Sequence, residues 1–234
     1  MFASQEKAQA LQGSRPPLDP ALRERIRPMV SASARWLPVA EELAELFPEG
    51  HCQRGWTVLI TAAFGQGGHS LAYALASEPS RRGHWCAVVG AEDPGIAAAA
   101  ELGLDLTRVV FVPLAGEPLA EAAGSLLDGF DMLLLVLDRG IKASTARRLA
   151  ARARDRRAVI VVVGKDNSVW PEADLTITVT DAHWEGLGQG SGRLRARQAR
   201  VHSVARRGER RPSAHALHLP SHEGSVGLCD DAKT

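Results

Sequence analysis

The sequence predicts an α/β protein built on a doubly wound, mainly parallel sheet. Apolar runs of strand length alternate with helical segments through the middle of the chain, and the connections between them are short. A glycine-rich loop joins the first run to the first helix, and an alternating, more polar pattern follows the last run. Strands and helices in this order are typical of a parallel sheet covered by helices on both faces.

The part of the chain before the sheet is predicted to form a helical arm. Residues 1–18 are polar and end in prolines, so we expect them to be disordered. Residues 19–49 are expected to hold two helices. Asp19-Pro20 offers a cap and a first-turn proline for one helix. Trp36–Phe47 repeats its apolar residues at spacings near three and four, which predicts the other.

The core domain, residues 50–204, is predicted to contain five parallel strands with four helices between them. Each strand candidate is a continuous apolar run, as expected of a strand buried on both faces. The predicted strands are Trp56–Thr61, Trp85–Val89, Arg108–Val112, Asp131–Leu137 and Ala158–Val163. The predicted helices are His69–Glu78, Gly95–Leu104, Pro118–Leu127 and Lys142–Arg154.

The end of the core is predicted to be an antiparallel hairpin. Asp174–Thr180 alternates apolar and polar residues, and Arg193–Val204 follows after a glycine-rich turn. Residues 205–234 are rich in Arg, Gly, Ser and His, so we expect a flexible C-terminal tail.

The charges are balanced over the whole chain but not along it. The 234 residues carry a formal net charge of +1. Arg139–Arg157 and Arg193–Arg211 each contain eight Lys or Arg residues and one acidic residue. The sequence therefore predicts a local basic face on a nearly neutral molecule.

Cysteine and histidine spacings give no support for a metal site or a disulfide framework. Cys52, Cys86 and Cys229 lie far apart, which suits a reduced cytoplasm. The histidines at 215, 218 and 222 lie in the predicted tail, at spacings that fit no rigid metal site. No apolar run is long enough for a membrane span and no signal sequence is visible. We expect a soluble, cytoplasmic protein.

The glycine loop resembles a phosphate-binding loop that has lost two of its residues. Such a loop follows the pattern G-x-x-x-x-G-K-[ST], whose backbone N–H groups and lysine hold phosphates. This chain has Ala63 in place of the first glycine and His69 in place of the lysine. The candidate cofactor-binding residues are Gly65, Gly67, Gly68, His69 and Ser70.

Three interpretations of this loop remain open. A catalytic ATPase would need His69 to replace the lysine, but histidine is shorter and mostly neutral at pH 7. Weak binding of ATP with Mg²⁺ needs less, because the Ser70 hydroxyl could still meet the metal. The third interpretation is a turn that the fold retains, and on it we expect the loop to be empty and the protein to use no cofactor.

Two acidic residues follow predicted strands at the edge where ligands of open α/β sheets bind. Asp138 ends one apolar run, and Glu92 follows another. In that position an aspartate can hold Mg²⁺ through water and a glutamate can orient an attacking water. Both are also common as ordinary loop residues, so we treat them as candidate relics of a catalytic site.

Two sets of arginines are candidates for contact with nucleic acid or an acidic partner. Arg193, Arg195 and Arg197 alternate along a predicted strand and therefore point to one side of it. Arg148 and Arg152 share one face of a predicted helix. A solvated helix face is the alternative for the second set.

Longer motifs resemble a known family. The run Cys86–Pro94 followed by Ala100–Pro113 resembles the RecA recombinase core, in which a strand ends near a catalytic glutamate. Trp170–Leu175 and the stretch Trp184–Leu194, with its pattern W-x-G-L-G-x-G-x-G-R-L, resemble the RecA-like ImuA family, in its shortened actinobacterial ImuA-prime branch. The resemblance implies a degenerate RecA-like P-loop NTPase fold. It aligns Glu92 with the catalytic glutamate and Asp138 with the Walker-B aspartate.

The resemblance also implies a function. Members of the ImuA family are accessory proteins of the SOS-induced mutasome, which carries out error-prone translesion DNA synthesis during DNA repair. The implied partner is an ImuB-type, Y-family-like adaptor, with RecA and the C-family polymerase as indirect partners and DNA as a further candidate. We expect a non-enzymatic scaffold that associates with the nucleoid when active. The alternatives are a DNA-dependent ATPase or RecA paralogue with residual nucleotide binding, and an SOS cell-division inhibitor.

Overall fold

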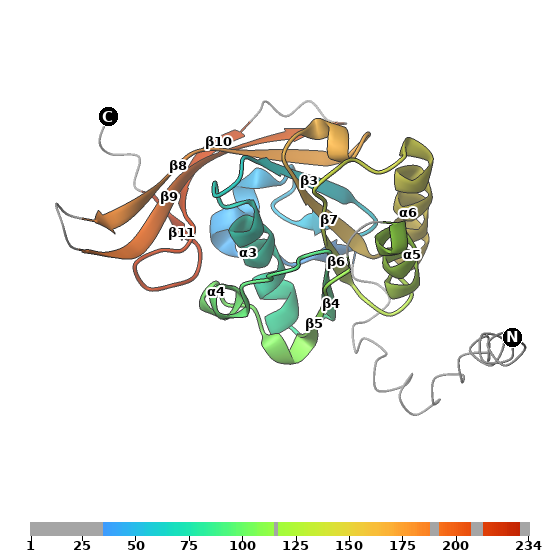
Figure 1. Ribbon diagram of the computed structural model, residues 1–234, viewed down its shortest axis with the longest axis horizontal. Helices are drawn as coiled ribbons and strands as arrows, with labels where there is room; N and C mark the ends of the chain where they lie inside the picture. The colour runs from blue at the N-terminus through green and yellow to red at the C-terminus, as the bar shows by residue number, and fades with distance from the viewer. Residues whose placement is uncertain (1–34, 115–116, 188–191, 207–212, 230–234) are drawn as a thin grey trace, which may run out of the picture.

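The computed structural model describes residues 35–114, 117–187, 192–206 and 213–229, and centres on a nine-stranded mixed sheet (Figure 1). Six neighbouring strands are parallel to one another, and three further strands continue one edge in antiparallel pairing. The large, mostly parallel sheet and the C-terminal antiparallel hairpin predicted from the sequence are thereby confirmed.

The strands follow one another across the sheet in an order that differs from their order in the chain. From the parallel edge inward they are β5 (Val109–Val112), β4 (Cys86–Val89), β6 (Met132–Val136), β7 (Val159–Gly164), β3 (Thr57–Ala62) and β8 (Leu175–Leu187). The antiparallel extension consists of β9 (Gly192–Ala205), β10 (Ser213–His218) and β11 (Gly227–Leu228). A separate two-stranded sheet pairs β1 (Trp36–Leu37) with β2 (Cys52–Gln53).

Helices cover both faces of the sheet and divide the core in two. Helices α3 (Gly68–Arg81) and α4 (Ile96–Glu101) pack on one face, and α5 (Glu117–Leu126) and α6 (Ala143–Arg156) on the other (Figure 1). Alternate residues of β3 show the division, because Val58 and Ile60 join the first core and Leu59 joins the second. Short 3₁₀ turns lie at Glu41–Leu46 (η2), Leu106–Arg108 (η3) and Asn167–Val169 (η4).

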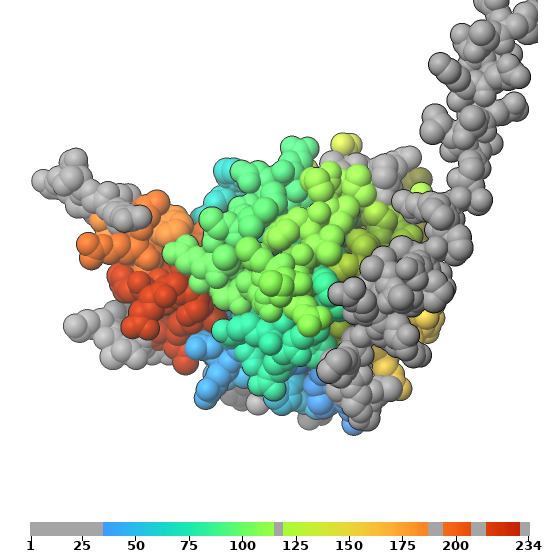
Figure 2. Space-filling model, turned by 90° about the horizontal axis from the view of Figure 1, so that it is seen from below, coloured from blue at the N-terminus to red at the C-terminus, as the bar shows by residue number. Residues whose placement is uncertain are grey.

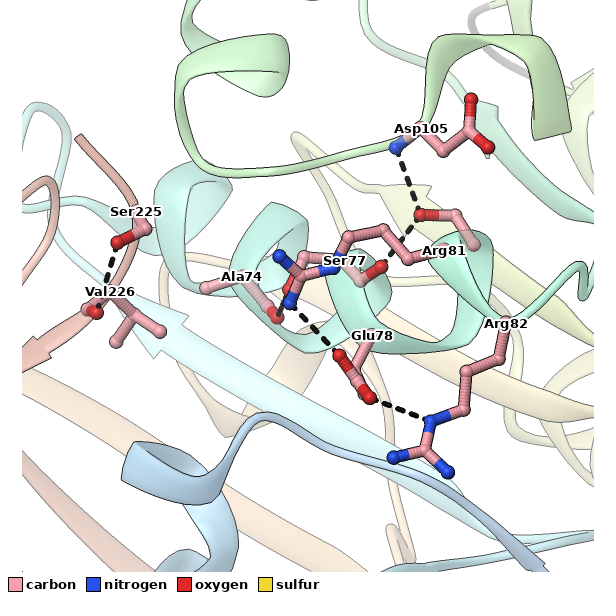
Figure 3. Close-up of polar contacts among 9 residues, drawn as sticks. Ala74, Ser77, Glu78, Arg81, Arg82, Asp105, Ser225 and Val226 are labelled. Atoms are coloured by element: carbon pink, nitrogen blue, oxygen red, sulfur yellow. Dashed lines mark hydrogen bonds and ion pairs between the residues drawn. The ribbon is translucent and has the colours of Figure 1, made fainter.

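Helix α3 extends one turn beyond the end predicted from the sequence. Pro79 lies inside it, but so close to the end that it interrupts little of the hydrogen-bond ladder. Glu78 holds the last turn by pairing with Arg81 at 2.9 Å and with Arg82 at 2.6 Å (Figure 3). Ser80 also accepts a hydrogen bond from the backbone of Asp105 at 3.0 Å, which fixes the turn to the next segment.

The N-terminal prediction is wrong where the structure describes it. Trp36–Phe47 does not form one helix but divides into β1 and the 3₁₀ turn η2. Pro38 explains the break, because a proline disfavours helical backbone at the residue before it and has no N–H to donate. Leu43 and Leu46 are nevertheless buried against the sheet. The predicted arm 1–18 and the helix beginning at Asp19 lie outside the described residues.

The chain after Ala205 also differs from the predicted flexible tail. Within it, β10 pairs with β9 over six residues and β11 pairs with β10. Leu217 and Leu219 are fully buried, so this segment belongs to the core. Its small, basic and histidine-rich composition concealed the alternation that marks a strand.

The C-terminal strands form one end of the molecule. Strands β8 and β9 run well past the helices as a long hairpin (Figure 1). Figure 2 shows the orange and red C-terminal strands at one side of the green and teal residues that form the middle of that face. Among the described residues, no helix combines the length and the apolar character needed to cross a membrane.

Candidate functional site

The glycine loop lies between the central strand β3 and the start of α3. Gly67 has φ of +96°, a left-handed conformation that glycine adopts without strain. A Cβ atom on Gly68 would lie 3.0 Å from the Cβ of Ala62 and 3.1 Å from Cγ1 of Val163. The glycines therefore serve the sharp turn and the close packing of α3 on the sheet.

The first turn of α3 lacks the usual partners for its free backbone N–H groups. No side chain caps the helix, and no acidic residue occurs in its first turn. The first N–H groups of an α-helix have no partner within the helix and carry the positive end of its dipole. An arrangement of this kind favours a bound anion.

Arg197 of β9 reaches this loop from the C-terminal hairpin. Its Nη2 donates a hydrogen bond to Oγ of Ser70, which is 127 residues away in sequence. A Cβ atom on Gly67 would lie 2.6 Å from the same nitrogen and 2.8 Å from Cζ. The guanidinium thus lies directly against Gly67, in space that any side chain at that position would fill.

The guanidinium of Arg197 is buried and incompletely paired. The residue is 7% exposed, and its Nε has no hydrogen-bond partner in the described part of the chain. Burial lowers the pKa of the guanidinium, although arginine stays charged at neutral pH. The ring of Trp184 lies 5.1 Å from Cζ, close enough for a cation–π contact.

Arg193, Arg195 and Arg197 were predicted to point to one side of a strand, but in the structure Arg195 and Arg197 lie in different surroundings. Arg195 is exposed, whereas Arg197 turns onto the glycine loop, and the side chain of Arg193 lies outside the described residues. The pairing of β8 with β9 shifts register between Thr180 and His183 and again between Glu185 and Leu187. Such bulges change the direction of side chains, and the sequence alone gave no sign of them.

His69 lies in the loop close to Asp138, one of the two strand-end carboxylates. Partial desolvation lowers the pKa of His69, and the nearby Asp138 carboxylate opposes this effect without overcoming it. His69 is therefore neutral at pH 7. Asp138 and Glu92 are both exposed and follow β6 and β4, which are neighbours in the sheet. Their predicted placement at the carboxyl ends of the strands is observed.

The second predicted set of arginines lies on α6, on the other face of the sheet. Arg148 and Arg152 help to line a cavity of about 960 Å³ between α5 and α6, together with Asp138. Arg152 is already paired with Asp128, at 2.6 Å from Nη2 to Oδ2. That hydrogen bond lowers the pKa of the Asp128 carboxyl. Arg148 is exposed and has no ion-pair partner among the described residues.

The glycine loop shows two differences from a site for ATP with Mg²⁺. The Ser70 hydroxyl, which would contact the metal, is bonded to a positively charged guanidinium instead. His69 supplies no charge in place of the lysine. The described residues also contain no cluster of His, Cys, Asp and Glu side chains suited to a metal ion. The side chains present do not fit the nucleotide–metal pair.

Comparisons with known proteins match the core of the chain. The sequence model of a family described as MT3502 N-terminal domain matches residues 45–172, more than half of the chain. The matched region includes the glycine loop, Glu92 and Asp138 but ends before Arg197. The uncharacterized protein Rv3395c of Mycobacterium tuberculosis is 33% identical over 132 residues, which are 56% of this chain and 55% of the relative. The chain thus spans about half the length of that relative, and both matches fit an actinobacterial family.

Proposed function

The chain belongs to the MT3502 N-terminal domain family, and we propose that it is a RecA-like accessory protein of the damage-induced mutasome. In this proposal it binds an ImuB-type adaptor and supports error-prone translesion synthesis without hydrolysing nucleotide. RecA and the polymerase are reached through the adaptor, and the protein acts at the nucleoid. The sequence motifs of Trp170–Leu175 and Trp184–Leu194 support the resemblance to the ImuA family.

The RecA-like part of the proposal is supported by the arrangement of the sheet. A glycine loop follows the central strand β3 and leads into a long helix. Glu92 and Asp138 follow two neighbouring parallel strands. An antiparallel hairpin extends the sheet beyond β8. These features support the proposal of a RecA-like core, which the sequence motifs suggested.

The hydrogen bond from Arg197 to Ser70 carries the proposal that the protein is not an ATPase. Phosphoryl transfer depends on positive charge at the phosphates, supplied by the loop lysine and by Mg²⁺. Here the lysine is replaced by a neutral histidine. The serine that would hold the metal is engaged by a cation, which repels Mg²⁺ from the same position.

The long hairpin is the surface that we propose for the adaptor. It exposes three large apolar side chains, with Trp184 at 41%, Leu194 at 45% and Val204 at 52% exposure. Arg195 and Arg200 are exposed on the same strand pair. Exposed aromatic and other apolar side chains and arginines are all common in protein interfaces.

A pull-down with a purified ImuB-type adaptor tests this function. The full chain is expected to retain the adaptor, and Leu194→Glu should reduce retention at least tenfold, because a charge would be buried in the interface. Val110→Glu is the matched control, since Val110 is an exposed valine (38%) on β5, at the other edge of the sheet.

Two results would contradict the proposal. One is failure of the full chain to retain the adaptor. The other is retention of the bacterial tubulin-like division protein in its place, together with filamentous cells on overexpression, which would favour the division inhibitor.

A further inference from the structure

We propose that the glycine loop and Arg197 together form a binding site for a phosphate group that requires no metal ion. The loop provides backbone donors at the start of α3, and Arg197 provides the positive charge. The ligand class is a phosphate ester or polyphosphate, carried by a free nucleotide or by the 5′ end of a DNA strand.

The backbone supplies the first half of the site. The start of the 14-residue helix α3 has neither a side-chain cap nor an acidic residue in its first turn. A Cβ atom on Gly65 would meet nothing within 4 Å, so a ligand can approach the backbone closely at that residue. Ser70 accepts a hydrogen bond from Arg197, and its own O–H is then free to donate to an anion.

Arg197 supplies the second and independent half. Arg197 as a whole residue is only 7% exposed, so its guanidinium has lost much of its hydration, and within the described ranges it has no carboxylate partner. A buried charge without a counterion is costly. Its unpartnered Nε lies next to the loop, 3.1 Å from the position that a Cβ of Gly67 would occupy. The missing partner of this side chain is an anion at the loop.

The Arg197 guanidinium favours a phosphate ligand, and its positive charge makes Mg²⁺ unnecessary for binding. The planar fork of arginine donates two parallel hydrogen bonds to phosphate oxygens. Because Arg197 occupies the Ser70 hydroxyl, the charge that a metal would bring is already present in the protein. Phe64, at the tip of the loop, is fully exposed, and an aromatic face of this kind can stack on a nucleobase.

Calorimetric titration of the full chain in EDTA tests the site. The probes are inorganic pyrophosphate, ATP, and oligothymidylate with either a 5′-phosphate or a 5′-hydroxyl. We expect at least one phosphate probe to bind, and Arg197→Gln to weaken it at least tenfold. Arg156→Gln removes the same charge at an exposed position on α6, and it should change the affinity less than twofold. Excess Mg²⁺ should not strengthen binding.

The probes also distinguish the source of the phosphate. Preference for the 5′-phosphate oligonucleotide over the 5′-hydroxyl one assigns a DNA end, and equal binding of the two with tight ATP binding assigns a free nucleotide. Arg197→Lys keeps the positive charge but lacks the two parallel N–H donors of the guanidinium, so this variant should bind the phosphate probes with intermediate affinity. If Arg197→Gln does not fold, Arg197→Lys takes its place in the test. The proposal is wrong if no probe binds, if both Arg197 variants bind as the wild type does, or if binding requires Mg²⁺. No adaptor is present in these titrations, so their outcome is independent of the proposed partner.

Discussion

Single residues decide the chemistry of the glycine loop. Ser70 and Gly67 would belong to a nucleotide site in another protein, but here both are in contact with Arg197. The sequence predicted a glycine loop between a strand and a helix, and the structure has this loop between β3 and α3. The sequence did not identify Arg197 as part of the loop, since that contact depends on the bulges of a hairpin more than 100 residues away.

A buried ion pair between Arg54 and Asp131 is a second place where single charged groups determine a property of the molecule, here its stability. Arg54 Nη1 lies 2.8 Å from Oδ1 of Asp131, and their side chains are 9% and 5% exposed. Burial alone would raise the pKa of the Asp131 carboxyl. Contacts from His84 and Arg54 outweigh it, so the pKa lies below the ordinary aspartate value. The pair joins the segment before β3 to the start of β6.

Loss of the Asp131 charge is expected to destabilise the fold strongly. Asp131→Asn leaves Arg54 charged and buried, so the free energy of unfolding in urea at pH 7 should fall by about 3–5 kcal/mol. Asp128→Asn, which removes the exposed partner of Arg152, should cost about 1 kcal/mol or less. Similar losses in the two variants would contradict the role of burial.

The same carboxyl predicts a pH dependence. Because its pKa is lowered in the folded state, its contribution is fully present above the ordinary aspartate value of about 4. The contribution is lost as the pH falls through the lowered pKa. The stability difference between wild type and Asp131→Asn should therefore shrink when urea unfolding is repeated well below pH 4. A difference that stays constant with pH would show that the charge of Asp131 is not its cause.

At the scale of elements, prediction succeeded where the signal was local. The runs of β3, β6 and β7 are apolar on both faces, and each appears in the structure within two residues of its expected bounds. The helix expected over Trp36–Phe47 failed because Pro38 breaks the pattern that the apolar spacing suggests. Strand β10 was missed because its partner, β9, supplies the hydrogen bonds that its composition does not predict.

Strand β10 is expected to be an integral part of the core. Leu217 is fully buried, and Leu228, its partner in the register of β10 and β11, is 60% exposed. Leu217→Ala should lower the free energy of unfolding in urea by about 2–5 kcal/mol, because it leaves a cavity. Leu228→Ala should change it by about 0.5 kcal/mol or less. Equal effects would show that the end of the chain does not pack as described.

One sheet joins the two regions of the molecule for which we propose functions. The parallel half carries the loop, Glu92 and Asp138 at its carboxyl end. The antiparallel extension carries Arg197 and the exposed hairpin. At the glycine loop, the hydrogen bond from Arg197 to Ser70 and the hydrogen bond from the backbone N–H of Ala182 to Oε1 of Gln66, at 3.0 Å, add to the backbone pairing of β8 with β9 in joining these regions. The surface proposed for the adaptor and the site proposed for phosphate are therefore parts of one structural unit.

The central claim is that the chain retains a RecA-like frame without its hydrolytic chemistry. The most direct measurement is release of inorganic phosphate from ATP by the full chain, with Mg²⁺ and with or without single-stranded DNA. The account predicts no release above that of buffer, because Arg197 and His69 stand where the metal and the lysine would act. Turnover that disappears in Glu92→Gln and in Asp138→Ala would contradict it and would identify the protein as an ATPase.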